Sequence, residues 1–381
     1  MLPLSTLLFA VSTLLLALAA LPGALNAQRG DLLVVANKQA ATATVLEVVS
    51  GRTLATLPTG VGPHEVAVSR DGRWAVVTNY GAQTPGSSLI LIDLDRRAVT
   101  KTIRLGEYQR PHGAAFLPNG HLAVTVETNR AVLIVDLDRG TVLRALPTGE
   151  AGTHMLAVSP DGRTIYTANI GGGSVTALDV TGLAPARTAK VAPRTEGIAL
   201  SPDGRRLWIG SNQDNTVTVL DAATLTPLDT LPAPGLPYRL ALTPDGRRAV
   251  VSNPTLNAVR IFDAAGRHET ALVQIPAGTA GEGGAGPVGF ALSPDGRTAF
   301  VALQGRNQVG VLDLATGTLT RYMDVGNGPD GIAYAARGRT LSSAKPRTRS
   351  RNICSSSLRT VSGAPPVARS TVAIVCHCAW G

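Results

Sequence analysis

Residues 153–163 read THMLAVSPDGR, and residues 195–205 read TEGIALSPDGR. Five further copies of this segment begin at Pro63, Pro111, Pro237, Pro287 and Pro329. The last of these copies keeps the frame but lacks the Pro-Asp pair, and successive copies start 42, 48 or 50 residues apart. A period of roughly 40–50 residues is typical of propeller blades, in which each unit is a four-stranded sheet that packs against its neighbours.

Each repeat unit contains the pattern of four strands. Residues 154–159 are predicted as the first strand, and the Pro-Asp-Gly that follows predicts a tight turn, because glycine tolerates a positive φ. Thr164–Asn169 and Ser174–Asp179 are predicted as the second and third strands, and a variable fourth strand leads into the next unit. The third strands end in a recurring aspartate: Asp93, Asp136, Asp179, Asp221, Asp263 and Asp313. We expect these carboxylates to bond their own turn backbone, which is a structural role.

The order of the strands also predicts how the ring closes. The repeats begin at residues 32–37, which match a second strand, and the seventh first strand, residues 330–335, lies at the other end. Seven complete blades therefore require the C-terminal strand to complete the N-terminal blade, which removes the open sheet edges. The sequence predicts an all-β fold, a seven-bladed β-propeller of four-stranded blades over residues 28–336.

The second strands carry a family resemblance. Residues 76–79 read VVTN and residues 166–169 read YTAN, and the second of these is followed by a Val-x-x-Leu-Asp third strand at residues 175–179. These units resemble the YVTN-type β-propeller repeat family over residues 31–336, although no copy reads YVTN in full. The resemblance implies a secreted or periplasmic seven-bladed propeller, in a clan that includes lactonase-like enzymes and redox-associated proteins. It brings no catalytic motif with it.

The net charge of +9 does not belong to the repeats. Residues 331–381 hold eight basic residues and no acidic ones, whereas residues 1–330 hold 27 basic and 26 acidic residues. A near-neutral body with only 4% aromatic residues lacks the basic groove and stacking platforms of a nucleic-acid binder. All three cysteines also lie after residue 353, so the body has no disulfide framework. We expect no nucleic-acid partner.

The two ends of the chain differ from the repeats. Residues 2–21 are apolar, and residues 1–27 are predicted to be a signal peptide cleaved after Ala27, with an uncleaved membrane anchor as the alternative. Export to the periplasm or the extracellular space follows, with no membrane span after cleavage. Residues 337–381 are interpreted either as a disordered basic appendage or, preferably, as a stretch read out of frame.

One end of the predicted ring carries the candidate chemistry. We call this end the top face; it holds the loops between second and third strands and the connections between blades. Every length change of the repeat falls there, at residues 81–88, 106–110 and 277–286. Variable loops on a rigid scaffold are the usual place for binding and catalysis, although variation can also be merely tolerated there.

Three of the six histidines occupy one repeat position on that face. His64, His112 and His154 each open an innermost strand, and Glu196 holds the position in the next unit. Three imidazoles and a carboxylate suit a divalent metal such as zinc. The same residues are also compatible with a metal-free polar ligand site, or with a structural role in hydrogen bonding to loops.

The other candidate residues surround these histidines. Asn79, Glu127 and Asn169 end the second strands of the same units, and Tyr108 and Arg110 precede His112; Glu127 is the candidate catalytic base and the other four are candidate ligand-binding residues. The sequence favours an exported propeller that binds a small molecule or a protein partner through the top face of its central channel. The alternative is a metal-dependent hydrolase of lactonase type, in which bound metal activates water.

Overall fold

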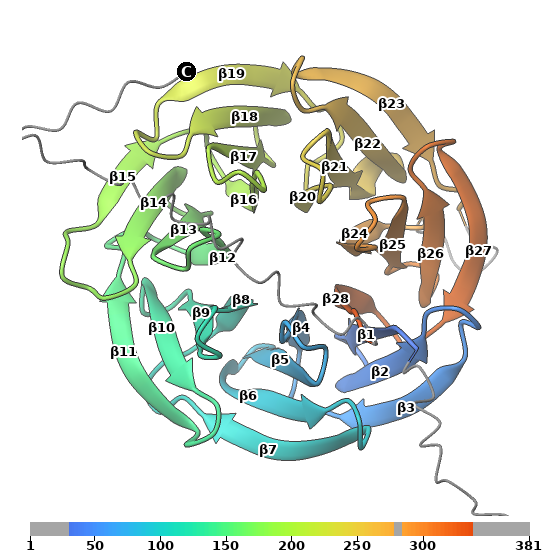
Figure 1. Cartoon of the computed structure of the whole chain (residues 1–381), viewed down its shortest axis with the longest axis horizontal. Helices are drawn as coiled ribbons and strands as arrows, with labels where there is room; N and C mark the ends of the chain where they lie inside the picture. Colours follow the sequence, from blue (N-terminus) through green and yellow to red (C-terminus); the bar gives the residue numbers. More distant parts are fainter. Residues whose placement is uncertain (1–29, 278–283, 338–381) are drawn as a thin grey trace, which may run out of the picture. The chain divides into compact units, whose positions relative to one another are not determined.

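The computed structural model describes residues 30–277 and 284–337, and within these ranges it contains 28 β-strands and one short 3₁₀ helix. The strands form seven four-stranded antiparallel sheets, arranged as blades around a ring (Figure 1). The predicted signal peptide, most of the tail and the glycine-rich residues 278–283 lie outside the described residues. The prediction of a seven-bladed propeller is confirmed.

The first three blades have the following strands. Blade one consists of β28 (Pro329–Ala335), β1 (Leu32–Asn37), β2 (Thr42–Glu47) and β3 (Thr53–Pro58). Blade two consists of β4 (Pro63–Val68), β5 (Trp74–Gly81), β6 (Pro85–Asp93) and β7 (Ala98–Arg104). Blade three consists of β8 (Pro111–Phe116), β9 (Leu122–Val126), β10 (Ala131–Asp136) and β11 (Thr141–Pro147).

The other four blades follow the same order from the channel outward. Blade four consists of β12 (Thr153–Val158), β13 (Thr164–Asn169), β14 (Ser174–Asp179) and β15 (Arg187–Lys190). Blade five consists of β16 (Thr195–Leu200), β17 (Arg206–Ser211), β18 (Thr216–Asp221) and β19 (Pro227–Pro232). Blade six consists of β20 (Leu240–Leu242), β21 (Arg248–Asn253), β22 (Ala258–Asp263) and β23 (His268–Gln274), with the 3₁₀ helix η1 (Pro254–Leu256) after β21. Blade seven consists of β24 (Pro287–Leu292), β25 (Thr298–Leu303), β26 (Gln308–Asp313) and β27 (Thr318–Asp324).

The ring closes through the pairing of the last strand with the first. β28 runs antiparallel to β1, with Leu33 opposite Tyr334 and Val35 opposite Ile332. The C-terminal strand therefore completes the N-terminal blade, as the repeat order predicts. This pairing supplies the innermost strand of blade one, so that all seven blades have four strands.

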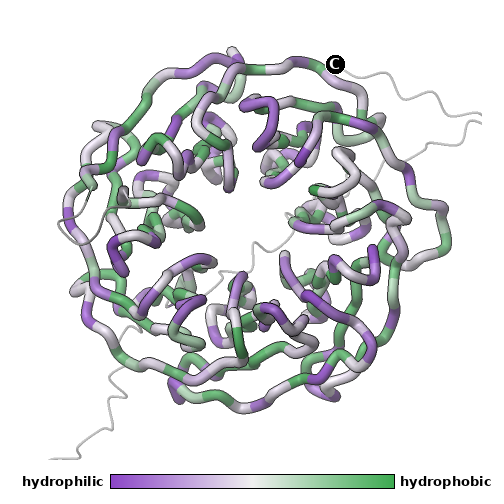
Figure 2. Tube along the Cα trace, turned by 180° about the vertical axis from the view of Figure 1, so that it is seen from behind, coloured by the Kyte–Doolittle hydropathy of each residue, from purple (hydrophilic) through white to green (hydrophobic). Residues whose placement is uncertain are grey.

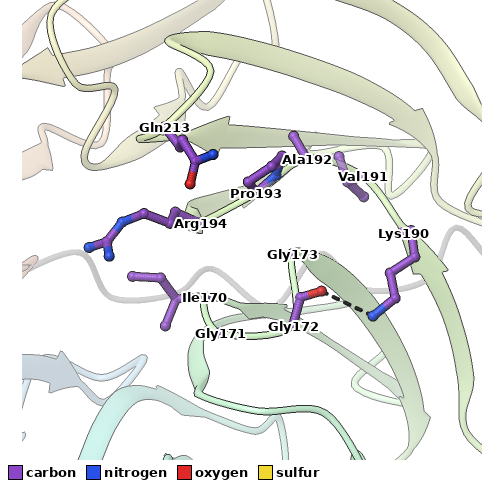
Figure 3. Close-up of a pocket in the computed structure, with 10 residues that line it drawn as sticks. All are labelled: Ile170, Gly171, Gly172, Gly173, Lys190, Val191, Ala192, Pro193, Arg194 and Gln213. Atoms are coloured by element: carbon purple, nitrogen blue, oxygen red, sulfur yellow. Dashed lines mark hydrogen bonds between the residues drawn. The ribbon is translucent and has the colours of Figure 1, made fainter.

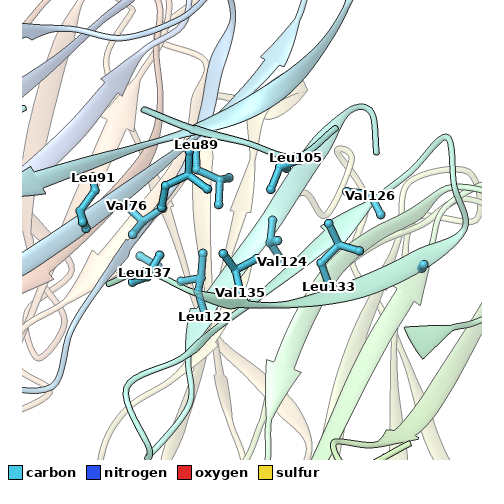
Figure 4. Close-up of a cluster of buried hydrophobic side chains, with 13 residues drawn as sticks. Val76, Leu89, Leu91, Leu105, Leu122, Val124, Val126, Leu133, Val135 and Leu137 are labelled. Carbon is cyan, nitrogen blue, oxygen red and sulfur yellow. The ribbon is translucent and has the colours of Figure 1, made fainter. Parts of the chain in front are cut away.

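The hydrophobic core is divided among the interfaces between blades. Each of the seven buried clusters joins side chains from two adjacent blades. In Figure 4, Val76 and Leu89 of blade two meet Leu122, Val124 and Leu133 of blade three. Hydrophobic and hydrophilic segments alternate along the chain all round the ring (Figure 2). Burial of these faces is the main stabilising contribution, and each blade depends on its neighbours for it.

The recurring aspartates have the structural role expected of them. Asp93 Oδ1 accepts backbone N–H groups of residues 95 and 96, and Asp313 Oδ1 accepts those of residues 315 and 316. Equivalent bonds from the turn backbone to the aspartate are made at Asp136, Asp179, Asp221 and Asp263. The prediction for these six residues is confirmed.

Glycine at the third position of several innermost strands allows these strands to approach one another closely. A Cβ atom at Gly331 would lie 2.2 Å from the carbonyl oxygen of His64, and one at Gly289 would lie 2.1 Å from that of Asp330. Neither contact is possible for a larger residue without a backbone shift. The second-position side chains, including that of His64, are therefore held close together around the channel.

Candidate functional site

The second residue of each innermost strand, or its equivalent in blade six, contributes to one ring of side chains. The seven residues are His64, His112, His154, Glu196, Tyr238, Val288 and Asp330. Six of the seven are polar, and the three histidines and the two carboxylates are less than 9% exposed. The structure therefore brings the four predicted metal ligands together, and adds Asp330 on the other side of His64.

The three imidazoles are stacked. The ring centroids of His64 and His112 lie 4.2 Å apart, and those of His112 and His154 lie 3.8 Å apart. The edge of the Tyr80 ring also meets His112, at 5.4 Å between centroids. His112 is 1% exposed, and neither of its ring nitrogens has a hydrogen-bond partner among the described residues. Burial holds its pKa well below the usual value, so the ring is neutral.

His154 is held between two carboxylates. Its Nδ1 bonds Glu127 Oε1, and its Nε2 lies 2.8 Å from Glu196 Oε1. Burial opposes the charged ring, but the two carboxylates outweigh that effect and raise the pKa of His154 to about 9. For Glu196, His154 and Arg239 outweigh burial and lower the pKa to about 2. His154 is therefore an imidazolium, and both of its nitrogens are donors.

His64 is neutral and lies between Lys38 and Asp330. Lys38 Nζ lies 2.8 Å from His64 Nε2 and 3.3 Å from Asp330 Oδ2. His64 Nδ1 lies 3.4 Å from Asp330 Oδ2 and 3.9 Å from Glu65 Oε1, without hydrogen-bond geometry to either. Burial lowers the pKa of His64 to about 4, although the carboxylate of Asp330 opposes this effect.

Arg239 connects the ring across the channel. Its Nη2 lies 2.5 Å from Glu65 Oε1 in blade two, and its Nη1 lies 2.6 Å from Glu196 Oε1 in blade five. Strand β20 begins only at Leu240, so Arg239 lies in the irregular segment that precedes it. Arg239 is 6% exposed, and the guanidinium stabilises two buried carboxylates at once.

Glu127 is part of the cluster because β8 and β9 pair one residue out of step with the equivalent strands of blades two and four. Pro63 pairs with Asn79 and Thr153 with Asn169, whereas Pro111 pairs with Val126, so Glu127 lies one residue beyond the end of β9 and not at the strand end, where it was predicted. Its Oε2 accepts a hydrogen bond of 2.6 Å from the hydroxyl of Tyr80. Although burial opposes it, the bonds from His154 and Tyr80 lower the pKa of Glu127.

The other predicted ligand-binding residues do not join this cluster. The side-chain amide of Asn79 bonds Ser88 and the backbone of Gly60, and that of Asn169 bonds Ser174 and Thr176, all within or beside their own blades. Tyr108 packs against the hydrophobic cluster between blades two and three.

Arg110 lies beside the cluster. Its guanidinium carbon is 4.8 Å from the centroid of the Tyr80 ring, and its Nη2 donates to the carbonyl of Ala82. Its side chain therefore meets the polar cluster at Tyr80, and its carbonyl accepts the backbone N–H of Glu127 at 3.2 Å.

Six residues of the cluster were not predicted: Lys38, Glu65, Tyr80, Asn212, Arg239 and Asp330. Lys38 and Asn212 follow the ends of β1 and β17, Tyr80 is the next-to-last residue of β5, and all three occupy the same repeat position as Glu127. Asn212 joins the cluster because its Nδ2 donates to Glu196 Oε2 at 3.1 Å. Glu65 and Arg239 occupy the third position of the innermost segments, where four of the other five units have glycine. Aligning the repeats at these two positions, as well as at the histidine position, would have found them.

Among the residues that the structure describes, two sets of three offer ligand atoms for a metal ion. His64, Glu65 and His112 have ligand atoms within 4.8 Å of one another, and so do His112, Glu127 and His154. The two sets share His112. The predicted set of three histidines and Glu196 is thus divided, because Glu196 bonds His154 and Arg239 instead.

A surface groove of about 650 Å³ lies between blades four and five (Figure 3). It is lined by the loop 170–173, residues 190–194 and Gln213. Lys190 Nζ bonds the carbonyl of Gly172 and the carboxylate of Glu150, each at 3.0 Å. None of the residues predicted for the site lines this groove.

Comparisons of sequence and structure place the chain among known proteins. Its fold is similar to that of Kuenenia stuttgartiensis hydrazine synthase, with a TM-score of 0.64, 22% identity, and coverage of 74% of this chain and 92% of that chain. It is also similar to a functionally unknown protein from Desulfotomaculum acetoxidans, with a TM-score of 0.68, 15% identity, and coverage of 80% and 99%. At these identities the likeness shows the fold alone. No curated protein matches the sequence.

Within the described ranges, no helix has the length and apolar character needed to cross a membrane. Residues 118–337 match the family of the cytochrome D1 heme domain. The matched stretch runs from blade three to the closing strand and is more than half of the chain. The resemblance to YVTN-type repeats is not confirmed by this match, whereas the propeller class to which it pointed is. The chain belongs to the cytochrome D1 heme domain family.

Proposed function

We propose that this protein is an exported propeller that binds a small ligand through the top face of its central channel, at the cluster around His112. Export rests on the predicted signal peptide, and the family match is consistent with a binding role. A rigid ring with convergent polar side chains at its centre is a common arrangement for ligand sites in propellers. Alternatively, the same face binds a protein partner.

The unpartnered imidazole of His112 is the observation that carries the proposal. Both of its nitrogens are buried, and a neutral imidazole has one donor and one acceptor to satisfy. A buried polar group without a partner costs about 1–3 kcal/mol. Such groups occur where a ligand, ion or water completes the hydrogen bonding. We infer that the ligand of this propeller contacts His112.

The family name implies haem, and the histidines of the channel do not fit an axial role. An axial histidine needs a nitrogen that faces an open, flat space for the macrocycle. Both faces of His112 are covered, by His64 and His154, and its nitrogens are buried in the stack. The nitrogens of His154 are engaged by carboxylates.

Two other histidines are described, and neither offers such a space. His121 lies in the turn after β8 and contacts Asn119, while His268 begins the outermost strand of blade six. The described histidines therefore give no support to a haem-dependent function.

The hydrolase alternative has less support. A general base needs a free lone pair near the reacting water and a pKa close to the working pH. Glu127 accepts from Tyr80 and His154 on its two oxygens, and its pKa is lowered. Binding rather than hydrolysis is the function that this geometry favours.

Replacement of His112 tests the proposal without knowledge of the ligand. If His112 is retained for binding, His112→Leu should raise the free energy of unfolding of the ligand-free protein by about 1 kcal/mol, because an unpartnered polar group is removed. The matched control is His121→Leu, at an exposed turn.

A thermal-melt screen with divalent metal ions, small carboxylates and small amines completes the test. At least one compound should raise the melting temperature of the wild-type protein but not that of the His112→Leu variant. A destabilised variant together with no wild-type response to any compound would show that His112 is structural.

A further inference from the structure

We propose that His64, Glu65 and His112 form a site for one divalent transition-metal ion, and that Lys38 governs this site by fixing the tautomer of His64. The inference rests on the proposed function, because it names the ligand of the channel cluster. It places the ion on one side of His112, away from His154.

Several potential metal-ligand atoms at and beside His64 and His112 have no hydrogen-bond partner. His64 Nδ1 and both nitrogens of His112 lack hydrogen-bond partners, and so does Asp330 Oδ1 beside them. The ligand atoms of His64, Glu65 and His112 lie within 4.8 Å of one another. Shifts of about 1 Å would bring them to the separations of roughly 3–4 Å that a tetrahedral zinc ion requires.

The other set of potential ligands is already occupied. His154 donates from one nitrogen to Glu127 and from the other to Glu196, so it has no lone pair for a metal. A metal ion at His112, Glu127 and His154 would have to break a buried ion pair. The geometry therefore favours the His64 side.

The charge of the cluster favours a cation over an anion. Three buried carboxylates, those of Glu65, Glu196 and Asp330, and the half-buried carboxylate of Glu127 face three cationic groups: Lys38, His154 and Arg239. One negative charge is left over. If Lys38 withdraws and a divalent ion binds, the cluster becomes neutral, which lowers the electrostatic cost of its burial.

Lys38 opposes binding of the metal ion because it keeps the ring proton of His64 on the nitrogen that would bind the ion. An ammonium group has only donors, so its contact of 2.8 Å with Nε2 makes that nitrogen an acceptor and leaves the ring proton on Nδ1. Nδ1 is the nitrogen that faces Glu65 and Asp330. A metal ion can bind Nδ1 only after the proton has moved to Nε2, which requires Lys38 to leave. The Lys38 side chain is 35% exposed and can turn toward the solvent.

Metal titration of the full chain tests both parts of the proposal. Equilibrium dialysis should find one Zn²⁺ per chain, and His112→Ala or His64→Ala should weaken binding by about 100-fold or more. Lys38→Met should strengthen binding by about tenfold, because the competing hydrogen bond is lost. Lys190→Met is the matched control for removal of a lysine charge, and it should leave the affinity unchanged.

The Lys38 variant keeps the test decisive if a histidine variant fails to fold, since a gain in affinity cannot come from misfolding. Visible absorption of the Co²⁺-loaded protein should report imidazole ligation in the wild type. Unchanged affinity in Lys38→Met, or loss with His154→Ala but not with His64→Ala, would overturn the inference. A His112-dependent haemin complex without zinc binding would also overturn it. If an organic compound stabilises only the wild type while Zn²⁺ does not bind, this inference fails and the proposed function stands.

Discussion

Arg239 and Glu65 are joined across the ring, from the segment before β20 to β4, by two hydrogen bonds of 2.5 and 3.1 Å to the same carboxylate oxygen. They are 174 positions apart in the chain. Each occupies the third position of its innermost segment, where four of the other five segments have glycine. The pair links blade six to blade two directly, in addition to the packing between adjacent blades.

Removal of the arginine should be strongly destabilising. Arg239→Met leaves Glu65 buried without its cation and leaves Glu196 with His154 alone, and breaking one side of a buried pair costs about 3–5 kcal/mol. Chemical denaturation of the variant should show a loss of this size in the free energy of unfolding. Arg205→Met, in an exposed turn, serves as the control. A loss below about 1 kcal/mol would mean that the ion pair contributes little in solution.

The stability of the protein should be highest near pH 6.5. The pKa of His154 is raised to about 9, so its contribution is complete below the unfolded-state value of 6.5 and is lost as the pH rises toward 9. The pKa of His64 is lowered to about 4, so the unfolded chain takes up a proton between pH 6.5 and 4 that the folded chain does not. Stability should therefore fall on both sides of pH 6.5.

Denaturation curves between pH 4 and pH 9 check this profile. The alkaline loss due to His154 should be on the order of 3 kcal/mol. His154→Gln should flatten the alkaline limb and leave the acid limb in place. An alkaline limb of the same slope in that variant would assign it to another group.

The fold could be predicted from the sequence because each blade repeats one local pattern. The Pro-Asp-Gly turns and the third-strand aspartates fix the strand ends within each unit, and the count of first and second strands fixes the closure of β28 on β1. These features need no knowledge of distant contacts. The interfaces between blades then follow from the alternation of buried residues along each strand.

The site could be predicted only in part, because its residues come from three repeat positions. The histidine position is visible from the alignment of units, and it identifies His64, His112 and His154. The pairing of Arg239 with Glu65 depends on distance across the ring, which periodicity does not contain. Asn79 was predicted to bind ligand, but its side chain bonds Ser88 within the blade, and it is the neighbouring Tyr80 that bonds Glu127 in the channel cluster. A difference of one residue along a strand turns the side chain to the opposite face.

Backbone strain before the innermost strands should be measurable at Arg194. The residue before each of these segments has a positive φ, and four of the seven are glycine: Gly62, Gly152, Gly286 and Gly328, against Arg110, Arg194 and Leu236. Arg194 has a φ of 53° and an exposed side chain. Arg194→Gly relieves about 1 kcal/mol of strain, which partly offsets the greater freedom of glycine in the unfolded chain.

Thermal unfolding should therefore show that Arg194→Gly is neutral or slightly stabilising, whereas Gly152→Ala at the equivalent position lowers the melting temperature. A Cβ at Gly152 would also lie 2.9 Å from the backbone nitrogen of Gly171. Equal losses in the two variants would contradict the assignment of strain to this position.

A methyl group at Gly331 should disturb the fold and the site together. The Cβ of Gly331→Ala would lie 2.2 Å from the carbonyl oxygen of His64 and 2.6 Å from the Cα of Glu65, and both are backbone atoms that cannot turn aside. β28 and β4 must separate, so we expect a loss of about 2 kcal/mol or more in the free energy of unfolding. Gly30→Ala is the matched control, because its Cβ would meet only the flexible Glu47 side chain, at 3.4 Å. Since the same shift displaces His64 from Lys38 and Asp330, the acid limb of the stability profile should change in Gly331→Ala and not in Gly30→Ala. Identical profiles in the two variants would show that the approach of β28 to β4 does not position His64.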